Sequence, residues 1–379
     1  KRALNPLRPT MRGLAENDDI YFQMAEAHNP YYENIDDIVN RYMKKLNTKM
    51  RTDYRPFNYY GHLTGKIVIV AMGSVCETIK ETIDKLAEKG EKLGLLEVHL
   101  YRPFSTKYFL KELPSTVQKI AVLDRTKDIT APGEPLYLDV VSAVSNKKIK
   151  VVGGRYGLSS KNTTPAQIKA VFDMLDKPKH NFTIGINDDV TNLSLKESKN
   201  FKIGGTEDFL FYGYGSDGMV GVSKLIMKLI GNNTKNYVQG YFEYDSKKSG
   251  GVTASHLRIS KNPIRKTYYV DTPKFVVVTK ESYLKEFDTL KGIEKGATLL
   301  LNTSKSEEEI KKVLTDEVWY QIRSKKIKFY IINAYELANR VGLNNKISTV
   351  MASAILYLTN IMDYNTAKFE MKKEAEKKF

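Results

Sequence analysis

Cysteine is nearly absent from this sequence of 379 residues, in which Cys76 is the only one. A single thiol excludes a disulfide framework within the chain and any iron–sulfur or zinc site that needs four thiolates from it. Cys76 stands near the start of a predicted helix. We interpret it as a small buried core residue and not as a reactive thiol. The five histidines show no metal-ligand spacing, so no metal site is predicted.

Long apolar runs are lacking as well. No stretch approaches the roughly 18 residues that a membrane-spanning helix needs, and no signal peptide precedes the first predicted domain. We therefore expect no membrane partner and an intracellular, reducing location. The sequence begins at Lys1 without a methionine, which suggests a fragment of a longer protein.

Positive charge is in excess, but the basic residues are not concentrated in one part of the sequence. Sixty basic and 44 acidic residues give a formal net charge of +16. Nucleic-acid-binding proteins gather such a surplus on one face or along one helix, whereas the lysines here are scattered and no interleaving of aromatic and basic residues is found. A bias toward lysine and asparagine accounts for the surplus, and no nucleic-acid partner is predicted.

The length and the apolar pattern predict two α/β domains, because 379 residues exceed one ordinary core. Residues 1–65 are predicted as an extended arm and connector with a helical patch at Ile35–Met43. Strands and helices alternate over residues 66–180, which predicts a compact parallel-sheet domain. Residues 181–206 are polar and irregular, as in a linker, and residues 207–379 form the second domain. Its predicted elements end in a helix at about 346–361 and a solvated Lys/Glu tail.

A glycine-rich turn opens the second domain. An apolar, aromatic run from Phe209 precedes Gly213, Gly215 and Gly218, which have GxGxxG spacing, and the apolar residues that follow repeat at helical intervals. A strand, a glycine turn and a helix together can bind phosphate, because the turn lets backbone amides at a helix N-terminus approach an anion. The pattern alone also fits a purely structural turn.

A second stretch makes phosphate binding more specific. The predicted strand 236–245 is followed by Lys247, Lys248 and a Ser-Gly-Gly turn. If this strand lies beside the first one in a parallel sheet, both lysines reach the same carboxyl edge as the glycine turn, where α/β sheets bind ligands. Glu243 or Asp245 could bind the ribose of a dinucleotide, but the lysine pair favours an additional phosphate. A phosphorylated dinucleotide and coenzyme A remain as candidates.

Four polar residues elsewhere are interpreted as structural. His256 and Arg258 share one face of the predicted strand 252–260; they could reach a nucleotide, but a satisfied pair on a strand is the favoured interpretation. Arg102 and Asp124 in the first domain are interpreted as packing and interface groups. No catalytic residue is assigned to this chain.

Residue strings along the whole chain resemble one known family. In the first domain they are Gly-Lys-Ile-Val-Ile-Val-Ala-Met-Gly-Ser, Arg102-Pro103-Phe104, Asp124-Arg125-Thr126-Lys127 and Gly-Arg155-Tyr-Gly-Leu. This part resembles the transketolase C-terminal-like domain of pyruvate:ferredoxin (flavodoxin) oxidoreductase. The second domain, with Tyr-Gly-Ser-Asp-Gly and Tyr-Asp-Ser-Lys-Lys-Ser-Gly-Gly-Val-Thr, resembles the gamma domain of the same enzyme, which is an α/β domain.

The resemblance implies an enzyme that decarboxylates pyruvate on thiamine diphosphate with Mg, passes electrons through [4Fe-4S] clusters to ferredoxin or flavodoxin, and transfers the acetyl group to coenzyme A. The family places thiamine diphosphate and the clusters on other domains, so we expect this chain to hold neither and to be inactive alone. Its implied partners are those domains, ferredoxin or flavodoxin through them, and a second copy in a homodimer. The implied location is the cytoplasm or an anaerobic organelle such as a hydrogenosome.

What the resemblance assigns to this chain is coenzyme A binding. By motif, the binding residues would be Gly215, Ser216, Asp217, Gly218, Met219, Lys247, Lys248 and Ser348. Two of them depart from the family pattern, because Met219 stands where threonine is usual and Ser348 where asparagine is expected. Asp217-Gly218 followed by Asn232-Asn233 imitates a thiamine diphosphate signature, but Ser216 replaces its first glycine and the gap is too short. A non-catalytic scaffold and an NADP-binding reductase domain remain as alternatives.

Overall fold

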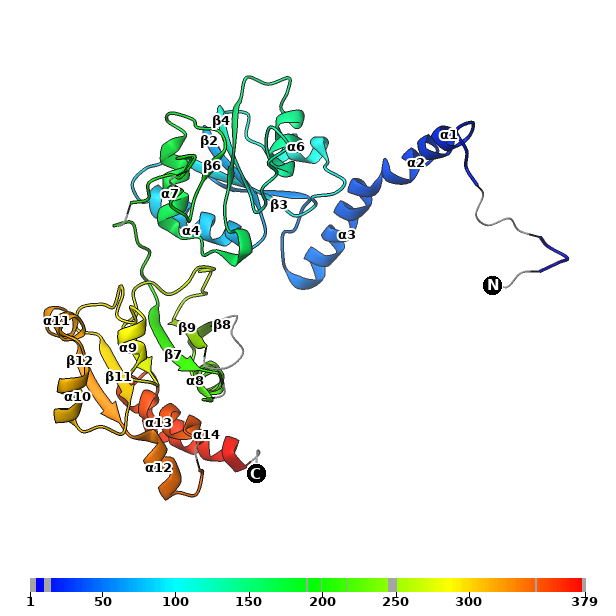
Figure 1. Ribbon diagram of the computed structural model, residues 1–379. Coiled ribbons are helices and arrows are strands. Elements are labelled where there is room, and N and C mark those ends of the chain that lie inside the picture. The colour runs from blue at the N-terminus through cyan, green and yellow to red at the C-terminus, as the bar shows by residue number, and fades with distance from the viewer. Residues whose placement is uncertain are drawn as a thin grey trace. The chain divides into compact units, whose positions relative to one another are not determined.

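The computed structural model describes residues 5–9, 15–188, 190–198, 200–215, 217–244, 251–344 and 346–376. The chain divides into two compact units, residues 1–201 and 202–379. Their boundary in sequence falls inside the stretch 181–206, while the domain assignments made from the sequence stay predictions. Each unit is described by itself (Figure 1).

The first unit is built on a sheet in the order β1-β3-β2-β4-β5-β6. The strands are β1 (Phe57–Gly61), β2 (Ile67–Met72), β3 (Leu93–Val98), β4 (Lys119–Asp124), β5 (Lys150–Arg155) and β6 (Phe182–Thr183). All neighbouring pairs are parallel except β1 and β3, which are antiparallel. The α/β class and the parallel sheet that the alternating pattern predicted are confirmed.

Helices cover both faces of this sheet. The helices are α4 (Val75–Ala87), α5 (Thr106–Glu112), α6 (Pro135–Ala143), α7 (Pro165–Met174) and the short 3-10 turn η1 (Leu158–Ser160). Buried side chains of α4 and α7 pack with Ile69 and Leu95 on one face. Those of α5 and α6 pack with Val68 and Leu96 on the other. Successive strand residues point to opposite faces, so the apolar runs of β2 and β3 serve both cores.

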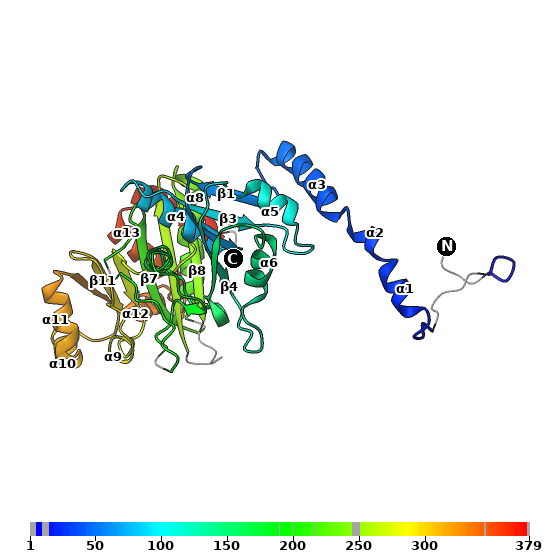
Figure 2. The same cartoon turned by 90° about the horizontal axis from the view of Figure 1, so that it is seen from above.

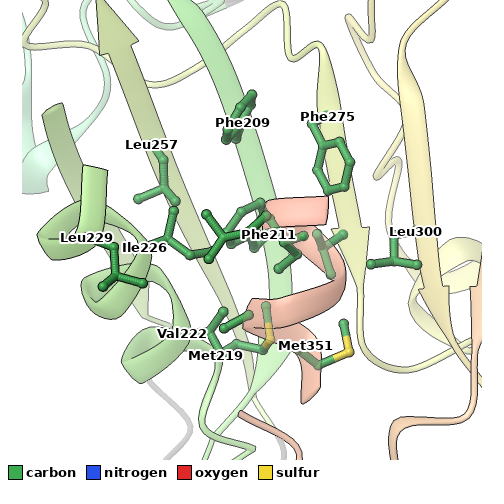
Figure 3. Close-up of a cluster of buried hydrophobic side chains, with 14 of the residues drawn as sticks. Phe209, Phe211, Met219, Val222, Ile226, Leu229, Leu257, Phe275, Leu300 and Met351 are labelled. Atoms are coloured by element: carbon green, nitrogen blue, oxygen red, sulfur yellow. The ribbon is translucent and has the colours of Figure 1, made fainter. Parts of the chain in front are cut away.

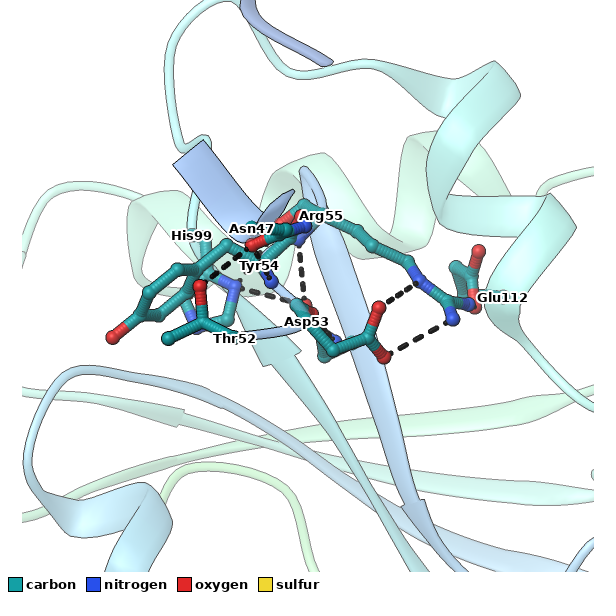
Figure 4. Close-up of polar contacts among 8 residues, drawn as sticks. Asn47, Thr52, Asp53, Tyr54, Arg55, His99 and Glu112 are labelled. Carbon is teal, nitrogen blue, oxygen red and sulfur yellow. Dashed lines mark hydrogen bonds and ion pairs between the residues drawn. The ribbon is translucent and has the colours of Figure 1, made fainter. Parts of the chain in front are cut away.

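The segment before β2 differs from the extended arm that the sequence predicted. It contains α1 (Tyr21–Glu26), α2 (Asn29–Tyr32) and α3 (Ile35–Met50), and then β1 joins the sheet. The helical patch Ile35–Met43 is therefore part of a longer helix. Hydrogen bonds explain why the chain turns back after α3: Asn47 accepts from the Tyr54 amide at 2.8 Å and from the Thr52 hydroxyl at 2.8 Å (Figure 4).

The second unit has a sheet in the order β12-β11-β10-β7-β9-β8. Its strands are β7 (Glu207–Tyr214), β8 (Tyr237–Tyr244), β9 (Val252–Ser260), β10 (Phe275–Val278), β11 (Thr298–Asn302) and β12 (Lys328–Ile332). From β7 through β10 and β11 to β12 the pairs are parallel. β9 is antiparallel to both β7 and β8. The expectation that β7 and β8 are neighbours in a parallel sheet is therefore wrong, because β9 lies between them.

The second unit also has helices on both faces of its sheet. They are α8 (Met219–Asn233), α9 (Tyr283–Glu286), α10 (Glu307–Val313), α11 (Asp316–Ser324), α12 (Ala334–Arg340), α13 (Ser348–Thr359) and α14 (Tyr364–Glu376). α8 and α12–α14 share one core with Phe209, Phe211 and Leu257 (Figure 3). α9, α10 and α11 share the other core with Val276 and Leu299, and α10 and α11 lie together in both views (Figures 1 and 2). Within the described parts of the chain, every helix is too short or too polar to cross a bilayer.

Candidate functional site

The turn between β7 and α8 is organised by the carboxylate of Asp217. Its Oδ2 accepts hydrogen bonds from the Tyr214 amide at 2.8 Å and the Thr279 hydroxyl at 2.8 Å, and its Oδ1 accepts from the Met219 amide at 2.9 Å. Gly213 makes room for this carboxylate, because a Cβ there would lie 2.5 Å from Asp217 Oδ2. In this structure Asp217 thus closes the turn and joins it to the end of β10 through Thr279.

The other residues of the turn have separate roles. Gly218 precedes α8 with a φ of 85°, a left-handed conformation that glycine adopts without strain. Met219 is the first residue of α8, and its side chain is buried in the core near Met351 (Figure 3). Its amide, a predicted phosphate donor, is bonded to Asp217. Gly215 is exposed at the end of β7, and Ser216 lies outside the described residues.

Ser348 lies beside the turn although 130 positions separate it from Gly218. It is the first residue of α13, and a Cβ at Gly218 would lie 3.3 Å from the Ser348 Cβ. α13 reaches this position because Met351, Ala352 and Ile355 are fully buried in the core that α8 also contributes to. The structure therefore brings together two residues that the sequence assigned to one site.

Lys247 and Lys248 lie outside the described residues. The residues on either side of that stretch are placed by sheet register. Tyr214 is paired with Val252, and Tyr244 with Thr253. The last residues of β7 and β8 therefore lie at the same edge of the sheet, two strands apart. The chain leaves this edge at Tyr244 and returns to it at Val252.

A groove of about 750 Å³ begins at Gly218 and Ser348 and runs along α8. Its lining comes from α8, from the segment that precedes α13 together with the start of α13, and from α14. The lining residues are Gly218, Gly221, Val222, Lys224, Leu225, Lys228, Leu343, Lys346, Ser348, Thr349, Met371, Glu374 and Ala375. The cationic side chains of this groove were not assigned to the site from the sequence. The i, i+4 spacing of Lys224 and Lys228 on a helix that follows a glycine turn is the signal that could have found them.

The lysines of the groove differ in their surroundings. Lys228 forms an ion pair with Glu374 of α14 at 2.5 Å. Lys224 lies 5.7 Å from the ring centroid of Phe242, and among the described residues it has no carboxylate partner. Three lysines and one glutamate leave the groove with an excess of positive charge. Electrostatics therefore favour an anionic ligand.

His256 and Arg258 do not reach the groove. Their neighbour Leu257 packs in the core with α8, so by strand alternation their side chains lie on the opposite face of the sheet. His256 Nδ1 accepts from the Val270 amide at 3.2 Å. The Arg258 guanidinium lies 3.6 Å from Asp208 and donates to Gln239 at 3.1 Å. His256 Nε2 and the Nε and Nη2 atoms of Arg258 are buried without a hydrogen-bond partner in the described part of the chain, so the two side chains are only partly satisfied and their structural role stays a prediction.

The polar residues singled out in the first unit are structural. Asp124 accepts from the amides of Leu136 and Tyr137, both at 3.1 Å, at the start of α6. Burial raises the pKa of this carboxyl group to about 6. Arg102 pairs with Asp139 at 2.7 Å. Cys76 is fully buried, as predicted, and burial raises the pKa of its thiol, which makes it a poor nucleophile.

The thiamine diphosphate lookalike fails a geometric test. The Asp217 carboxylate is engaged by three donors of the turn. Asn233 lies at the far end of α8, roughly 22 Å from Gly218 at the helical rise of about 1.5 Å per residue. There its side chain donates to the Leu229 carbonyl. These residues do not fit a diphosphate and its metal ion, and elsewhere in the described ranges no group of three or more His, Cys, Asp or Glu residues is placed to hold a metal.

Two family models match the chain. Residues 208–379 match the model described as pyruvate ferredoxin/flavodoxin oxidoreductase, and residues 65–168 match pyruvate:ferredoxin oxidoreductase core domain II. A pyruvate:ferredoxin oxidoreductase of Moorella thermoacetica is 48% identical over 97% of this chain. A pyruvate-flavodoxin oxidoreductase of Trichormus variabilis is 45% identical over 100% of it. The chain spans about a third of the length of these relatives, 32% in each case.

Solved structures are more distant. Pyruvate oxidoreductase subunit PORC of Thermotoga maritima matches 46% of this chain and 86% of its own, with 22% identity and a TM-score of 0.37. A 2-oxoglutarate:ferredoxin oxidoreductase of Magnetococcus marinus, with 2-oxoglutarate, coenzyme A and succinyl-CoA bound, matches 47% of this chain and 28% of its own, with 17% identity and the same TM-score. Neither likeness bears on the site. Because both family models and the relatives at 45% and 48% identity agree, the chain belongs to the pyruvate:ferredoxin (flavodoxin) oxidoreductase family.

Proposed function

We propose that the second unit supplies the coenzyme A site of a pyruvate:ferredoxin oxidoreductase. The full enzyme would convert pyruvate and coenzyme A to acetyl-CoA, CO2 and reduced ferredoxin or flavodoxin. The observation that carries the proposal is the groove, which is lined by the starts of α8 and α13 beside Gly218 and Ser348 and by three lysines.

The groove offers the contacts that coenzyme A, a nucleotide that carries a thiol, requires. Helix N-termini attract phosphate through their dipoles and free amides, and lysines add charge-assisted hydrogen bonds. Apolar side chains from α8 and α14, such as Val222, Leu225 and Met371, offer surface for the uncharged parts of the ligand. A volume of about 750 Å³ lies within the range typical of small-molecule sites. Lys247 and Lys248 stay in the proposal, because the chain between Tyr244 and Val252 starts and ends at the same edge.

The remaining chemistry is assigned to other parts of the enzyme. We propose that thiamine diphosphate, Mg and the [4Fe-4S] clusters are held outside this chain, since its one cysteine cannot ligate a cluster alone. The electron acceptor, ferredoxin or flavodoxin, would then interact with those parts. A homodimer of the full enzyme completes the proposed set of partners.

Calorimetric titration of the full-length enzyme with coenzyme A tests the proposal. We expect saturable binding that weakens at higher salt, because phosphate–lysine contacts are screened. The double variant Lys247→Ala, Lys248→Ala should bind more weakly and with a flatter salt dependence. Lys235→Ala is a matched control on the same unit, outside the groove lining. Binding of NADP without coenzyme A would favour a reductase domain instead, and binding of neither would favour a scaffold.

A further inference from the structure

We propose that Lys224 recognises a phosphate group on the ribose of the bound nucleotide and that Glu374 limits the affinity for it by neutralising Lys228. This inference rests on the proposed coenzyme A site and deepens it. It assigns a specificity-determining role to side chains of α8 and α14 that lie away from the glycine turn.

The groove offers cationic groups at two separate places. One is the end of the groove at Gly218 and Ser348, where Lys346 stands just before the start of α13 and Gly218 precedes α8. The other lies farther along α8, where Lys224 is about 9 Å and Lys228 about 15 Å from Gly218 by helical rise. Both side chains line the same groove. A ligand that fills it can therefore bind these lysines through two anionic groups separated along its length, which one compact anion does not offer.

The two lysines of the second place are not equivalent. Lys228 is held by Glu374 at 2.5 Å, so its charge is largely compensated. Lys224 has only the ring of Phe242 nearby and, among the described residues, no carboxylate partner. A phosphate group placed here gains more from Lys224, whose charge is not compensated, than from Lys228. Glu374 repels the same group because it lines the groove with a negative charge.

A nucleoside with a 5′-diphosphate and a second phosphate on its ribose matches this pattern. Its diphosphate lies next to the helix N-termini, where backbone amides and Lys346 can act together. The ribose phosphate is then one sugar ring farther along the groove, on the side of Lys224. Nucleotides without that phosphate leave Lys224 without a ligand contact.

Calorimetry on the full-length enzyme with coenzyme A and with 3′-dephospho-coenzyme A tests the assignment. Lys224→Gln should weaken coenzyme A binding by roughly five- to tenfold, the size of one partly exposed charge-assisted contact, and should leave the dephosphorylated compound almost unaffected. Glu374→Gln should act in the opposite direction and tighten coenzyme A binding by a few-fold. Lys235→Gln, with the same change of charge outside the groove lining, should change neither.

The possible outcomes separate this inference from the proposed function. If the wild-type enzyme binds coenzyme A and Lys224→Gln weakens both compounds equally, or neither, the inference is overturned and the site stands. If Glu374→Gln weakens binding, the compensating role of Glu374 is overturned. If the wild-type enzyme binds neither compound, the proposed site and the inference both fall.

Discussion

Replacing Asp217 by alanine should destabilise the second unit more than any other single change in the glycine turn. The sequence assigned Asp217 to ligand binding, whereas the structure gives its carboxylate three intramolecular donors: the amides of Tyr214 and Met219 and the hydroxyl of Thr279. Alanine removes all three acceptor contacts. The ends of β7 and β10 and the start of α8 then lose the group that joins them.

The magnitude follows from the number of contacts. A net hydrogen bond in a protein contributes about 1 kcal/mol, and more when the acceptor is charged. Three such contacts on a partly buried carboxylate predict a loss of about 3 kcal/mol in the free energy of unfolding. Thr279→Val removes one of the three and should cost about 1 kcal/mol. Combined with Asp217→Ala, it should add almost nothing, because its partner is already gone.

The chain provides a selective signal for this measurement. Its only tryptophan, Trp319, lies in α11 of the second unit, 5.8 Å from the ring centroid of Phe329. When these 379 residues are unfolded in urea by themselves, tryptophan fluorescence therefore reports on the second unit, not on the first. The double-mutant cycle on Asp217 and Thr279 needs only four such unfolding curves.

Two results would refute this account of the turn. Asp217→Ala could unfold at the wild-type urea concentration, which would mean that the three contacts contribute no net stability. Alternatively, the two substitutions could be additive, which would mean that Thr279 acts independently of the carboxylate. A variant that keeps wild-type stability but loses coenzyme A affinity would return Asp217 to the role that the sequence assigned to it.

Two further predictions concern the first unit. Burial raises the pKa of Asp124 from 3.8 to about 6, so the folded state holds the proton more tightly than the unfolded state, and stability should fall by on the order of 3 kcal/mol as pH rises from 4 to above 6. Hydrogen exchange across β4 should show this loss, and Asp124→Asn should abolish the pH dependence; an unchanged profile would contradict it. Gly154→Ala should destabilise β5 by roughly 1–3 kcal/mol, because a Cβ there would lie 2.2 Å from the ring of the buried Phe182. Faster exchange in β5 is the expected readout, and protection equal to that of wild type would show that the ring can move aside.

Elements whose signals are local were predictable from the sequence. The apolar run in Lys119–Asp124 is a local pattern that predicts a buried strand, because strands of a parallel sheet are covered on both faces, and β4 has those bounds. Thr164 followed by Pro165 is a local pattern that predicts a helix start, and Thr164 forms a capping box with Gln167 at the start of α7. In each case the residues that specify the element lie within it or next to it.

Features that depend on distant partners were not predictable in the same way. β1 lies in a stretch rich in Asn and Tyr, and it becomes a strand by pairing with β3, which follows more than 30 residues later. β8 has an exposed, weakly apolar pattern, and the sequence does not show that β9 separates it from β7. Pairing order is a property of the assembled sheet, because alternation along one strand fixes its faces but not its neighbours.

The same reasoning explains why the contribution of α14 to the groove was not predicted from the sequence. The Lys/Glu tail, residues 368–379, was interpreted as solvated because charged residues dominate it, yet Met371 of the tail is buried in the core that α8 contributes to, together with Ala367 one helical turn before it. Docking of this apolar pair carries Glu374 to Lys228. The helix that completes the groove therefore also sets its charge, and any change that undocks α14 should remove this part of the groove and uncover Lys228 at once. Affinity for anions is for this reason coupled to the burial of Met371. Undocking of α14 lowers the affinity by removing part of the groove and raises it by uncovering Lys228, and the larger of these two effects decides the net change. Glu374→Gln isolates the charge because it leaves the apolar pair in place.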